Sequence, residues 1–422
     1  MKIAIVGTGI SGLVVAHHLH RTHNITVFEA DDRVGGHANT VDVEVDGQTL
    51  AVDTGFIVCN DRTYPNFLGL LDELGVPTQP SDMSFGVSDA TTGIEYRASN
   101  PASLFAQPRN LLRPRFLRML ADIVRVNRTL QRLDAEDAVP DDVPLREFVA
   151  QLGVSPAYVD LYLVPFGSAI WSADPSQFLD FPVATYARFM ANHGLLGVRG
   201  QPTWRTVTGG SRRYVDALTA PFAHRIHTAT PVEKVVRRPS EGGESSVEVL
   251  AGGSRHEFDH VVLATHSDKA LRLLADPTSA ERSVLGDLRY RPNVATLHSD
   301  ERFLPRAPRA RSSWNVHVDP DTSAVPTLTY WMNRLQNLPT QTPLLVTLNR
   351  SDQIDPRLVH HEEAYDHPVV DVASVAAQRR RAEIQGKDGI WFAGAYWRYG
   401  FHEDGVLSGL DVVRGLEEAA SR

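Results

Sequence analysis

Three glycines near the N-terminus have the spacing of a loop that binds a dinucleotide. They lie in Gly7–Gly12, which reads Gly-Thr-Gly-Ile-Ser-Gly. The first glycine of such a loop permits a tight turn, the second lets a pyrophosphate approach the backbone, and the third lets a helix pack closely on a strand. The phosphates then face the N-terminus of the helix, where backbone N–H groups are free. We therefore predict nucleotide contacts at Gly7, Gly9, Ile10, Ser11 and Gly12.

The predicted elements around this loop are the ones that it needs. The apolar run Lys2–Val6 is typical of a buried strand, Ser11–Arg21 has a helical pattern, and Asn24–Glu29 predicts a second strand. Glu29 thus ends the second strand of a βαβ unit, where a carboxylate binds a ribose hydroxyl. The glycine pair Gly35–Gly36 permits a second close approach of the backbone, beyond the pyrophosphate and towards a ribityl chain. This second approach favours FAD as the nucleotide.

Several motifs resemble, in chain order, those of the flavin amine oxidase superfamily. The N-terminal signature of that superfamily is similar to Glu29, Gly35–Thr40 and Asp53–Gly55. Its later motifs are a Gly-Gly turn, a strand that contacts adenine through its backbone, a returning strand of the FAD domain and a C-terminal flavin motif. The segments that resemble them are Thr208–Ser211, Pro231–Val235, His260–Thr265, and Phe392–Gly394 together with Asp404–Gly409.

The resemblance implies an α/β (α+β, two-domain) architecture, with a Rossmann-like FAD-binding domain and a discontinuous substrate domain of helices over a mixed β-sheet. We place the FAD-binding domain at residues 1–78, 205–288 and 386–422, and the substrate domain at residues 79–204 and 289–385. The resemblance also implies non-covalent FAD, with contacts at Glu29, Ala30, Gly35, Gly36, His37, Thr54, Gly55, Phe56, Val232, Ala264, Gly394, Asp404, Gly405 and Val406. The last predicted helix, Gly405–Ala419, would stabilise the reduced flavin with its N-terminus.

The chain departs from the family pattern at three places. His37 stands where the family usually has an arginine after the glycine pair, so a fixed charge is lost. Ala395 stands where an acid usually follows the Phe-Ala-Gly motif. Amine oxidases commonly place a lysine on a strand of the substrate domain, where it holds a water at flavin N5. This sequence has no lysine from Ala270 to Gly386, which disfavours a conventional amine oxidase.

The segment Ala395–Glu403 is dense in aromatic residues and precedes the last predicted helix. In the family this segment passes close to the isoalloxazine. The candidate catalytic residues are therefore Tyr396 and Trp397, as walls of the substrate cavity, and His402, as a proton relay; an isolated histidine is more often structural. Further aromatic residues are candidate cavity walls or plain core: Tyr158, Tyr162, Phe166, Trp171, Phe178, Phe181, Tyr186, Phe189 and Trp204.

Seven arginines from Arg109 to Arg132 fall in one short stretch with a single acid, Asp122. Phe116–Leu133 predicts an amphipathic helix whose arginines and Asp122 share one side. The opposite side is predicted to carry Leu117, Leu120, Ile123, Val124 and Leu130. Such a helix could contact an anionic membrane surface through Arg115–Arg132, or guide an anionic substrate. A solvated face in an arginine-rich protein is the third interpretation.

The composition excludes several classes of protein. The chain has 422 residues, of which 42% are hydrophobic and 22% charged, which is typical of two to three globular domains. A net charge of −9 gives no indication of nucleic-acid binding. A single cysteine, Cys59, leaves no disulfide framework or thiolate metal cluster, and we interpret it as a buried hydrophobe rather than a covalent flavin anchor.

We predict no metal site and interpret His360–Glu363 as a solvated polar face. The sequence has no apolar run long enough to cross a membrane, and the first predicted strand leaves no space for a signal peptide. These features predict a cytoplasmic protein, at most peripheral at the inner face of the membrane.

Together, these features predict an FAD-dependent oxidoreductase in which the substrate transfers hydride to flavin N5 inside an apolar cavity. An unsaturated fatty-acyl chain is the favoured substrate, because aromatic faces can stabilise the cation that loss of an allylic hydride leaves. The reaction would be dehydrogenation or double-bond isomerisation. Two alternatives stay open: a flavin amine oxidase acting on a small amine or polyamine, and a non-enzymatic lipid-binding protein similar to a GDP-dissociation inhibitor.

Overall fold

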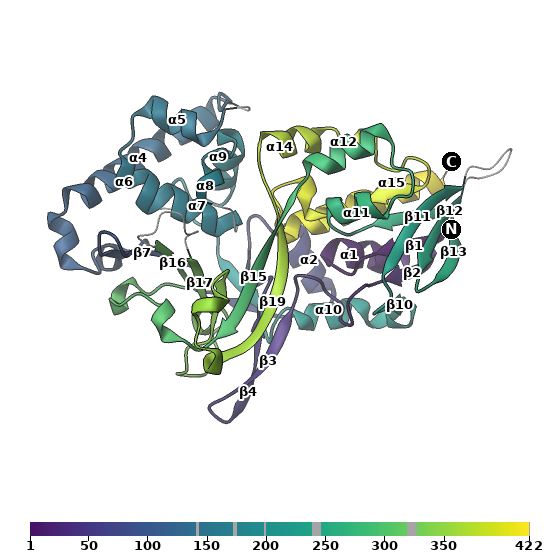
Figure 1. Ribbon diagram of the computed structural model, residues 1–422, viewed down its shortest axis with the longest axis horizontal. Helices are drawn as coiled ribbons and strands as arrows, with labels where there is room; N and C mark the ends of the chain where they lie inside the picture. Colours follow the sequence, from purple (N-terminus) through teal and green to yellow (C-terminus); the bar gives the residue numbers. More distant parts are fainter. Residues whose placement is uncertain (141–142, 172–174, 198–199, 239–245, 319–326, 422) are drawn as a thin grey trace.

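The computed structural model describes residues 1–422 apart from 141–142, 172–174, 198–199, 239–245, 319–326 and 422. The molecule is elongated, and two halves lie side by side along the horizontal axis of Figure 1. One half holds both chain termini, on the right of that view. The other holds a group of helices from α4 (Pro114–Ala135) to α9 (Val183–Asn192).

The half with the termini is built on a five-stranded parallel sheet. Its first strand is buried on both faces, because Ile3 and Ile5 pack into one core while Ala4 and Val6 pack into another. This is why the strand reads as a continuous apolar run. The strands lie in the order β10 (Ile226–His227), β2 (Asn24–Phe28), β1 (Lys2–Val6), β14 (His260–Leu263) and β20 (Ile390–Phe392).

Different elements cover the two faces of this sheet. Helices cover the first face, namely α1 (Ile10–Leu19), α2 (Pro65–Glu73), α10 (Arg212–Thr219) and α15 (His402–Ala420). The second face is covered by an antiparallel sheet and three helices, namely β11 (Val232–Arg238), β12 (Ser246–Ala251), β13 (Ser254–Phe258), α11 (Ser267–Leu273), α12 (Ser279–Asp287) and α14 (Val372–Arg379). The first face thus brings the N-terminus of α1 beside that of α15, whose residue Gly405 approaches Ile10 closely.

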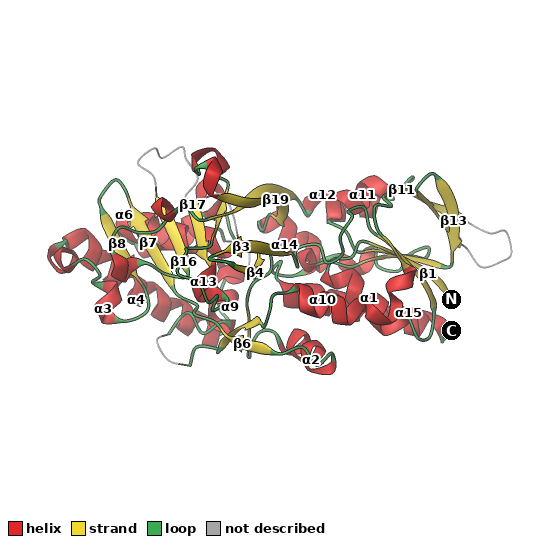
Figure 2. Cartoon of the chain, turned by 90° about the horizontal axis from the view of Figure 1, so that it is seen from below, coloured by secondary structure: helices red, strands yellow, loops and turns green. Residues whose placement is uncertain are grey.

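The other half is built on a seven-stranded mixed sheet, seen from below in Figure 2. Only β16 and β7 are parallel among its described pairs. The order is β19 (Val359–Pro368), β15 (Tyr290–His298), β18 (Leu345–Leu348), β17 (Thr327–Trp331), β16 (Trp314–Val318), β7 (Phe85–Asp89) and β8 (Ile94–Arg97). The helices of this half, besides α4 and α9, are α3 (Pro101–Leu104), α5 (Leu145–Leu152), α6 (Pro156–Tyr158), α7 (Val164–Trp171), α8 (Pro175–Phe178) and α13 (Met332–Leu335).

The long antiparallel pair β15 and β19 runs through the middle of the molecule, between the two halves (Figure 1). Two smaller sheets complete the described strands. One is the hairpin β3 (Thr40–Val45) and β4 (Gln48–Asp53); the other has the order β5 (Cys59–Asn60), β9 (Trp204–Val207) and β6 (Thr78–Pro80). The predicted domain boundaries stay a prediction. The hairpin, which they assign to the FAD-binding domain, packs Val43, Leu50 and Val52 into the core of the other half.

Most predicted elements are present within a few residues of their predicted ends, among them α1, β2, α2 and α9. The predicted helix Tyr158–Trp171 is formed by the end of α6, a π-helical turn at Val159–Leu163 and α7. One long strand escaped prediction. His360–Glu363, interpreted as a solvated face, lies in β19, whose side chains alternate between exposed and half-buried positions. Its sequence is polar and lacks the apolar pattern typical of a strand. The segment forms a strand because it pairs with β15.

The amphipathic pattern predicted for α4 was wrong at three positions. Asp122 lies on the buried side with 2% exposure, where its carboxylate accepts hydrogen bonds from Arg125 Nη2 and the Ser155 backbone N–H, both at 2.9 Å. Leu117 and Val124, predicted for the apolar side, are 42% and 48% exposed. A buried carboxylate is tolerated here because both of its oxygens have partners. None of the helices in the described parts of the chain is long and apolar enough to span a membrane.

Candidate active site

A cavity of about 620 Å³ extends through both halves of the molecule. Glycines and polar residues line its part in the half that holds the termini, and aromatic residues line the rest. We call these parts the nucleotide end and the substrate end. The predicted site residues that line it are Gly7, Gly9, Ile10, Ser11, Glu29, Ala30, Gly35, Gly36, His37, Gly55, Phe56, Ala264, Gly394, Tyr396 and His402. The structure thus brings segments from the whole length of the chain to one place.

The three glycines of the first loop have different structural roles. Gly7 has φ +102°, and a Cβ there would lie 2.8 Å from the Ala264 carbonyl oxygen. A Cβ on Gly12 would lie 2.1 Å from the Gly7 carbonyl oxygen, so this glycine lets α1 pack on β1 and does not line the cavity. A Cβ on Gly9 would meet nothing within 4 Å. The space that Gly9 leaves open lies at the N-terminus of α1, where a pyrophosphate would fit.

Glu29 lies at the end of β2, as predicted for a ribose ligand. Its Oε2 accepts a hydrogen bond from the Thr8 backbone N–H at 2.8 Å and another from the Thr8 hydroxyl. Its Oε1 accepts one from the backbone N–H of Asp31 at 3.1 Å. These bonds hold the carboxylate at the cavity beside the glycine loop. Thr8 and Asp31 also line the cavity, and neither was predicted, because Thr8 is a non-glycine position of the loop and Asp31 belongs to no motif.

The Asp53–Gly55 motif and the Gly-Gly turn at Thr208–Ser211 are tied to each other. The buried Asp53 carboxylate accepts hydrogen bonds from the backbone N–H and the hydroxyl of Ser211, at 2.9 and 2.8 Å. A Cβ on Gly210 would lie 2.6 Å from Thr40 Cγ2, so the turn needs glycine to approach the hairpin. This contact positions Gly55 and Phe56 at the cavity. Thr54 itself is buried behind it, with its hydroxyl 2.8 Å from that of Tyr365.

A cluster of three half-buried histidines lies at the nucleotide end. The ring of His37 is 6.1 Å from that of His266 and 5.5 Å from that of His367, between centroids. Burial lowers the pKa of His37 to about 4 and those of the other two to about 3. All three are therefore neutral near pH 7, and His37 supplies no fixed charge. The sequence analysis missed His266 and His367, which stand on different elements.

Lys269 also lines the nucleotide end, and its Nζ lies 3.2 Å from Asp366 Oδ2. The prediction concerned lysines on substrate-domain strands, and Lys269 is on α11, which packs on the parallel sheet. Its charge is matched by Asp366 on β19.

The C-terminal motif is arranged differently from its prediction. The last helix begins at His402, three residues earlier than predicted, so Asp404 lies inside its first turn. Asp404 Oδ2 accepts a hydrogen bond from the Phe401 backbone N–H, and burial raises the pKa of Asp404 to about 7. Gly405 and Val406 pack against α1 and the core and do not line the cavity. Asp404 and Val232 do not line it either.

Of the three candidate catalytic residues, Tyr396 and His402 line the cavity. The His402 ring stacks on Phe56 with centroids 3.7 Å apart, and its Nε2 lies 2.8 Å from the Tyr214 hydroxyl. Burial lowers the pKa of His402 to about 3, so the imidazole is neutral at pH 7. Trp397 does not line the cavity, because its indole N–H donates to the Phe392 carbonyl oxygen inside the second core. The prediction of Trp397 as a wall was wrong.

Aromatic side chains dominate the substrate end. Tyr162 and Phe166 stack with centroids 5.5 Å apart, and Phe85 meets Phe166 edge to face at 4.8 Å. Five of the nine predicted walls are present, namely Tyr162, Phe166, Trp171, Phe189 and Trp204. The other four are core residues without contact to the cavity, namely Tyr158, Phe178, Phe181 and Tyr186. Helical spacing alone does not distinguish the two sets, since both lie on buried faces.

The sole cysteine plays no part in this cavity. Cys59 is fully buried in β5, and burial raises the pKa of its thiol to about 12. Its neighbours Ile57 and Val58 line the cavity, whereas Cys59 does not. The described part of the chain also has no group of three or more histidine, cysteine or acidic side chains that could hold a metal ion.

Comparison with known proteins identifies the family. A family profile named flavin containing amine oxidoreductase matches residues 10–375. The chain belongs to this family. FAD is the family's cofactor, and the nucleotide end fits it: Gly9 leaves space at the N-terminus of α1, and Glu29 and the pair Gly35–Gly36 border that space. That FAD is held without a covalent bond stays a prediction.

Individual relatives are more distant. A Mycobacterium tuberculosis protein named as a flavin-containing monoamine oxidase, AofH, is 26% identical over 290 residues, which are 66% of this chain and 59% of the relative. The chain thus spans about three fifths of that relative's length. Cyclohexylamine oxidase from Brevibacterium oxydans has a TM-score of 0.68 at 18% identity, covering 100% of this chain and 99% of its own. A fatty acid isomerase from P. acnes has a TM-score of 0.67 at 17% identity, covering 98% of each chain. These two structures show that the fold is shared.

Proposed function

We propose that this family member is an FAD-dependent oxidoreductase that acts on an unsaturated fatty-acyl chain, by dehydrogenation or double-bond isomerisation. The observation that carries the proposal is the substrate end of the cavity. Its described lining residues are mostly aromatic or aliphatic, and none carries a carboxylate. The acids that line the cavity, Glu29, Asp31 and Asp366, lie at the nucleotide end. An ammonium group entering the substrate end would lose its hydration without a charged partner.

The residues of the chain would serve such a substrate in three ways. The stacked rings of Tyr162 and Phe166 and the neighbouring Phe85 form an apolar wall that excludes water from an extended hydrocarbon. Their faces would also stabilise positive charge that develops when an allylic C–H bond loses hydride. FAD, when bound, supplies the acceptor for that hydride. The imidazole of His402 is neutral and is held at Nε2 by the Tyr214 hydroxyl, so a proton relay at this residue would use its other nitrogen, Nδ1.

An amine substrate is the second candidate function. It is favoured by the family profile and by the solved amine oxidases that share the fold. Lys269 also lines the cavity, but its ion pair with Asp366 and its place at the nucleotide end separate it from the aromatic walls. A small amine at the substrate end would have to be bound as the neutral base.

The test is anaerobic mixing of the oxidised holoenzyme with a panel of unsaturated fatty acids and a panel of amines. Loss of the flavin absorbance, or a shifted double bond in the recovered lipid, is expected for the acids. Fast loss of absorbance with a simple amine, and no change in any lipid, would overturn the proposal in favour of the amine. Protein that purifies without colour and binds no FAD would indicate the lipid-binding alternative.

We further propose that the protein docks on an anionic membrane, from which it takes up such a lipid. The surface of the substrate half supports this proposal. A 3-10 turn at Pro108–Leu112 precedes α4, and its residues Leu111 and Leu112 are 52% and 86% exposed. Leu117 and Val124 on α4 are also exposed. Seven arginines lie in the same stretch of a protein of net charge −9, and of these Arg115 pairs with Asp160 while Arg118 and Arg125 pair with Asp122. Exposed apolar side chains in an arginine-rich stretch complement an anionic lipid surface. We call this surface, Arg109–Arg132, the arginine face.

A further inference from the structure

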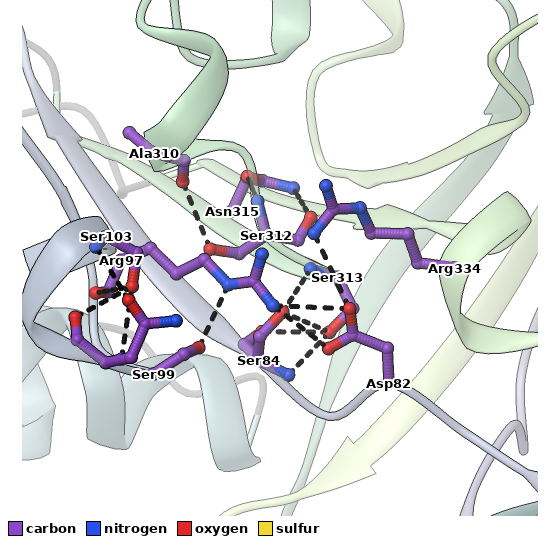
Figure 3. Close-up of polar contacts among 11 residues, drawn as sticks. Asp82, Ser84, Arg97, Ser99, Ser103, Ala310, Ser312, Ser313, Asn315 and Arg334 are labelled. Carbon is purple, nitrogen blue, oxygen red and sulfur yellow. Dashed lines mark hydrogen bonds and ion pairs between the residues drawn. The ribbon is translucent and has the colours of Figure 1, made fainter. Parts of the chain in front are cut away.

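Two arginines share one aspartate near the substrate end of the cavity. Asp82 Oδ2 lies 3.3 Å from Arg97 Nη2 and 3.5 Å from Arg334 Nη1. Figure 3 shows the two guanidinium groups approaching the carboxylate from opposite sides, Arg97 from β8 and Arg334 from α13. All three side chains are partly buried. One carboxylate therefore stands between two cations.

The charge around this cluster is positive. Arg334 also lies over the Trp331 ring, 4.6 Å from its centroid. Burial, followed by the charge of Arg97, lowers the pKa of Arg334. Arg311, which is close enough to act on the same group, has its own partner in Glu301. The three arginines and two acids leave one positive charge unmatched among these described residues.

The cluster adjoins the cavity through its chain neighbours. Met83 and Ser84 follow Asp82, and Ala98 follows Arg97; all three line the cavity. Ser84 is held by Ser313, whose hydroxyl accepts a hydrogen bond from the Ser84 backbone N–H at 2.7 Å (Figure 3). The Trp314 backbone N–H in turn donates to the Ser84 carbonyl oxygen. These two bonds fix Ser84 at the substrate end of the cavity, and we call this part of the lining, beside Asp82, the polar border.

An unpartnered donor lies at the same border. The indole Nε1 of Trp314 is buried and has no hydrogen-bond partner in the protein, although the ring lines the cavity. A buried N–H group without an acceptor costs free energy, so its presence in a cavity wall points to a ligand that brings an acceptor. This observation is independent of the arginine cluster. The arginine cluster favours an anionic ligand, and the indole N–H favours a ligand that carries a hydrogen-bond acceptor.

We propose that Arg97 and Arg334 bind the carboxylate of the fatty-acyl substrate, with the Trp314 indole N–H as a further donor. The inference rests on the proposed function and specifies its substrate as an acid with a free carboxylate. Guanidinium groups bind carboxylates through paired, charge-assisted hydrogen bonds. Asp82 holds the two arginines in place when the site is empty and competes with the ligand when it arrives. The hydrocarbon then extends from this border past the aromatic walls.

The experiment measures the binding of linoleic acid and of its methyl ester to the oxidised holoenzyme by titration calorimetry. R97Q and R334Q are each expected to weaken binding of the acid about tenfold. Neither change should alter binding of the ester, which has no charge to lose. D82N removes the competing carboxylate and should strengthen binding of the acid. R212Q, which breaks the ion pair of Arg212 with Asp42 on the other half, is the matched control and should change neither affinity.

The outcomes separate this inference from the proposed function. Unchanged affinity for the acid in R97Q and R334Q, or an equal loss for acid and ester, would overturn the inference. If either arginine variant has a lowered melting temperature, D82N decides: unchanged or weaker binding of the acid overturns the inference. Arginine-dependent binding of the acid without flavin bleaching or altered lipid supports the inference and overturns the proposed function. An enzyme that converts the lipid but binds it independently of both arginines overturns the inference alone.

Discussion

The two ends of the cavity are built in different ways. The nucleotide end depends on backbone at several glycines, whose Cβ atoms would collide with neighbouring chain or fill the space beside α1. The substrate end is formed by side chains from separate elements, including α7, α9, β9 and β16. A site made from backbone needs a particular residue at a particular spacing, whereas a site made from aromatic side chains accepts many arrangements. The first therefore leaves a signature in the sequence and the second does not.

The largest effects at the nucleotide end are expected from substitutions of Gly9 and Gly12. Gly9→Val places a side chain in open space, so the protein should fold normally and yet lose FAD, because the valine occupies the space of the pyrophosphate. Gly12→Val drives a Cβ into the Gly7 carbonyl oxygen and should prevent stable folding. Melting temperature without added FAD and the FAD retained through gel filtration measure the two effects. Full retention of FAD by Gly9→Val would contradict the assignment of this loop.

The same contrast explains how much of the fold could be predicted. The βαβ unit was predictable, because β1 is buried on both faces and the loop after it needs three glycines. The strand β19 was not, since its residues are polar and its order comes from pairing with β15. This strand matters for the site, because β19 places Asp366 and His367 at the nucleotide end. Long-range pairing of this kind has no local signal.

A second prediction separates walls from core at the substrate end. Phe178 is buried at 1% exposure among other aromatic rings, so Phe178→Ala should cost about 3–5 kcal/mol of unfolding free energy. Phe166 lines the cavity and is only half-buried, so Phe166→Ala should cost less stability and weaken binding of the acyl chain. Denaturant unfolding and calorimetric titration with linoleic acid measure the pair. Equal effects of both changes on chain binding would show that the wall is misassigned.

The candidate site was predictable where a motif fixes the backbone. Gly35–Gly36 and Gly55 were found by their motifs, and the structure places all three at the cavity. The motifs alone did not distinguish residues that line the cavity from residues that pack behind it. Gly405 and Val406 belong to the C-terminal motif yet pack on α1 and the core, because the helix begins earlier than predicted. Arg97 and Arg334 come from segments far apart in the chain, and no spacing connects them.

The histidine cluster predicts a loss of stability in acid. Burial holds the pKa values of His37, His266 and His367 at about 3–4, whereas in the unfolded chain they titrate near 6.5. The unfolded state therefore binds protons first as the pH falls below about 6.5, and each histidine removes up to about 1.4 kcal/mol per pH unit until its own folded pKa is reached. Asp53 and Asp404, whose pKa values burial raises to about 6 and about 7, act in the opposite direction.

Because of that opposition, the informative quantity is the difference between a variant and its parent. His367→Gln should flatten the decrease between pH 6.5 and 4, measured by denaturant unfolding across that range, with the amide keeping a bond to Asn293. His224→Gln, at an exposed position on the surface, is the control and should leave the profile unchanged. A profile of His367→Gln that parallels the parent would show that His367 is not held neutral in the folded protein.

The smallest effects are expected at the arginine face, where each charge acts alone through solvent. Arg128 and Arg132 are exposed on α4, so replacing either by glutamine should weaken binding to vesicles containing phosphatidylglycerol about fivefold and leave the fold intact. Arg125 is unsuitable for this test, because its replacement would strip the buried Asp122 of a partner. Leu112→Ser removes the most exposed leucine and should weaken binding at high salt, where charge no longer contributes. Arg282→Gln, exposed on α12 in the other half, controls for net charge. Co-sedimentation that is equal for all four variants and the parent would show that the arginine face contacts solvent and not the membrane.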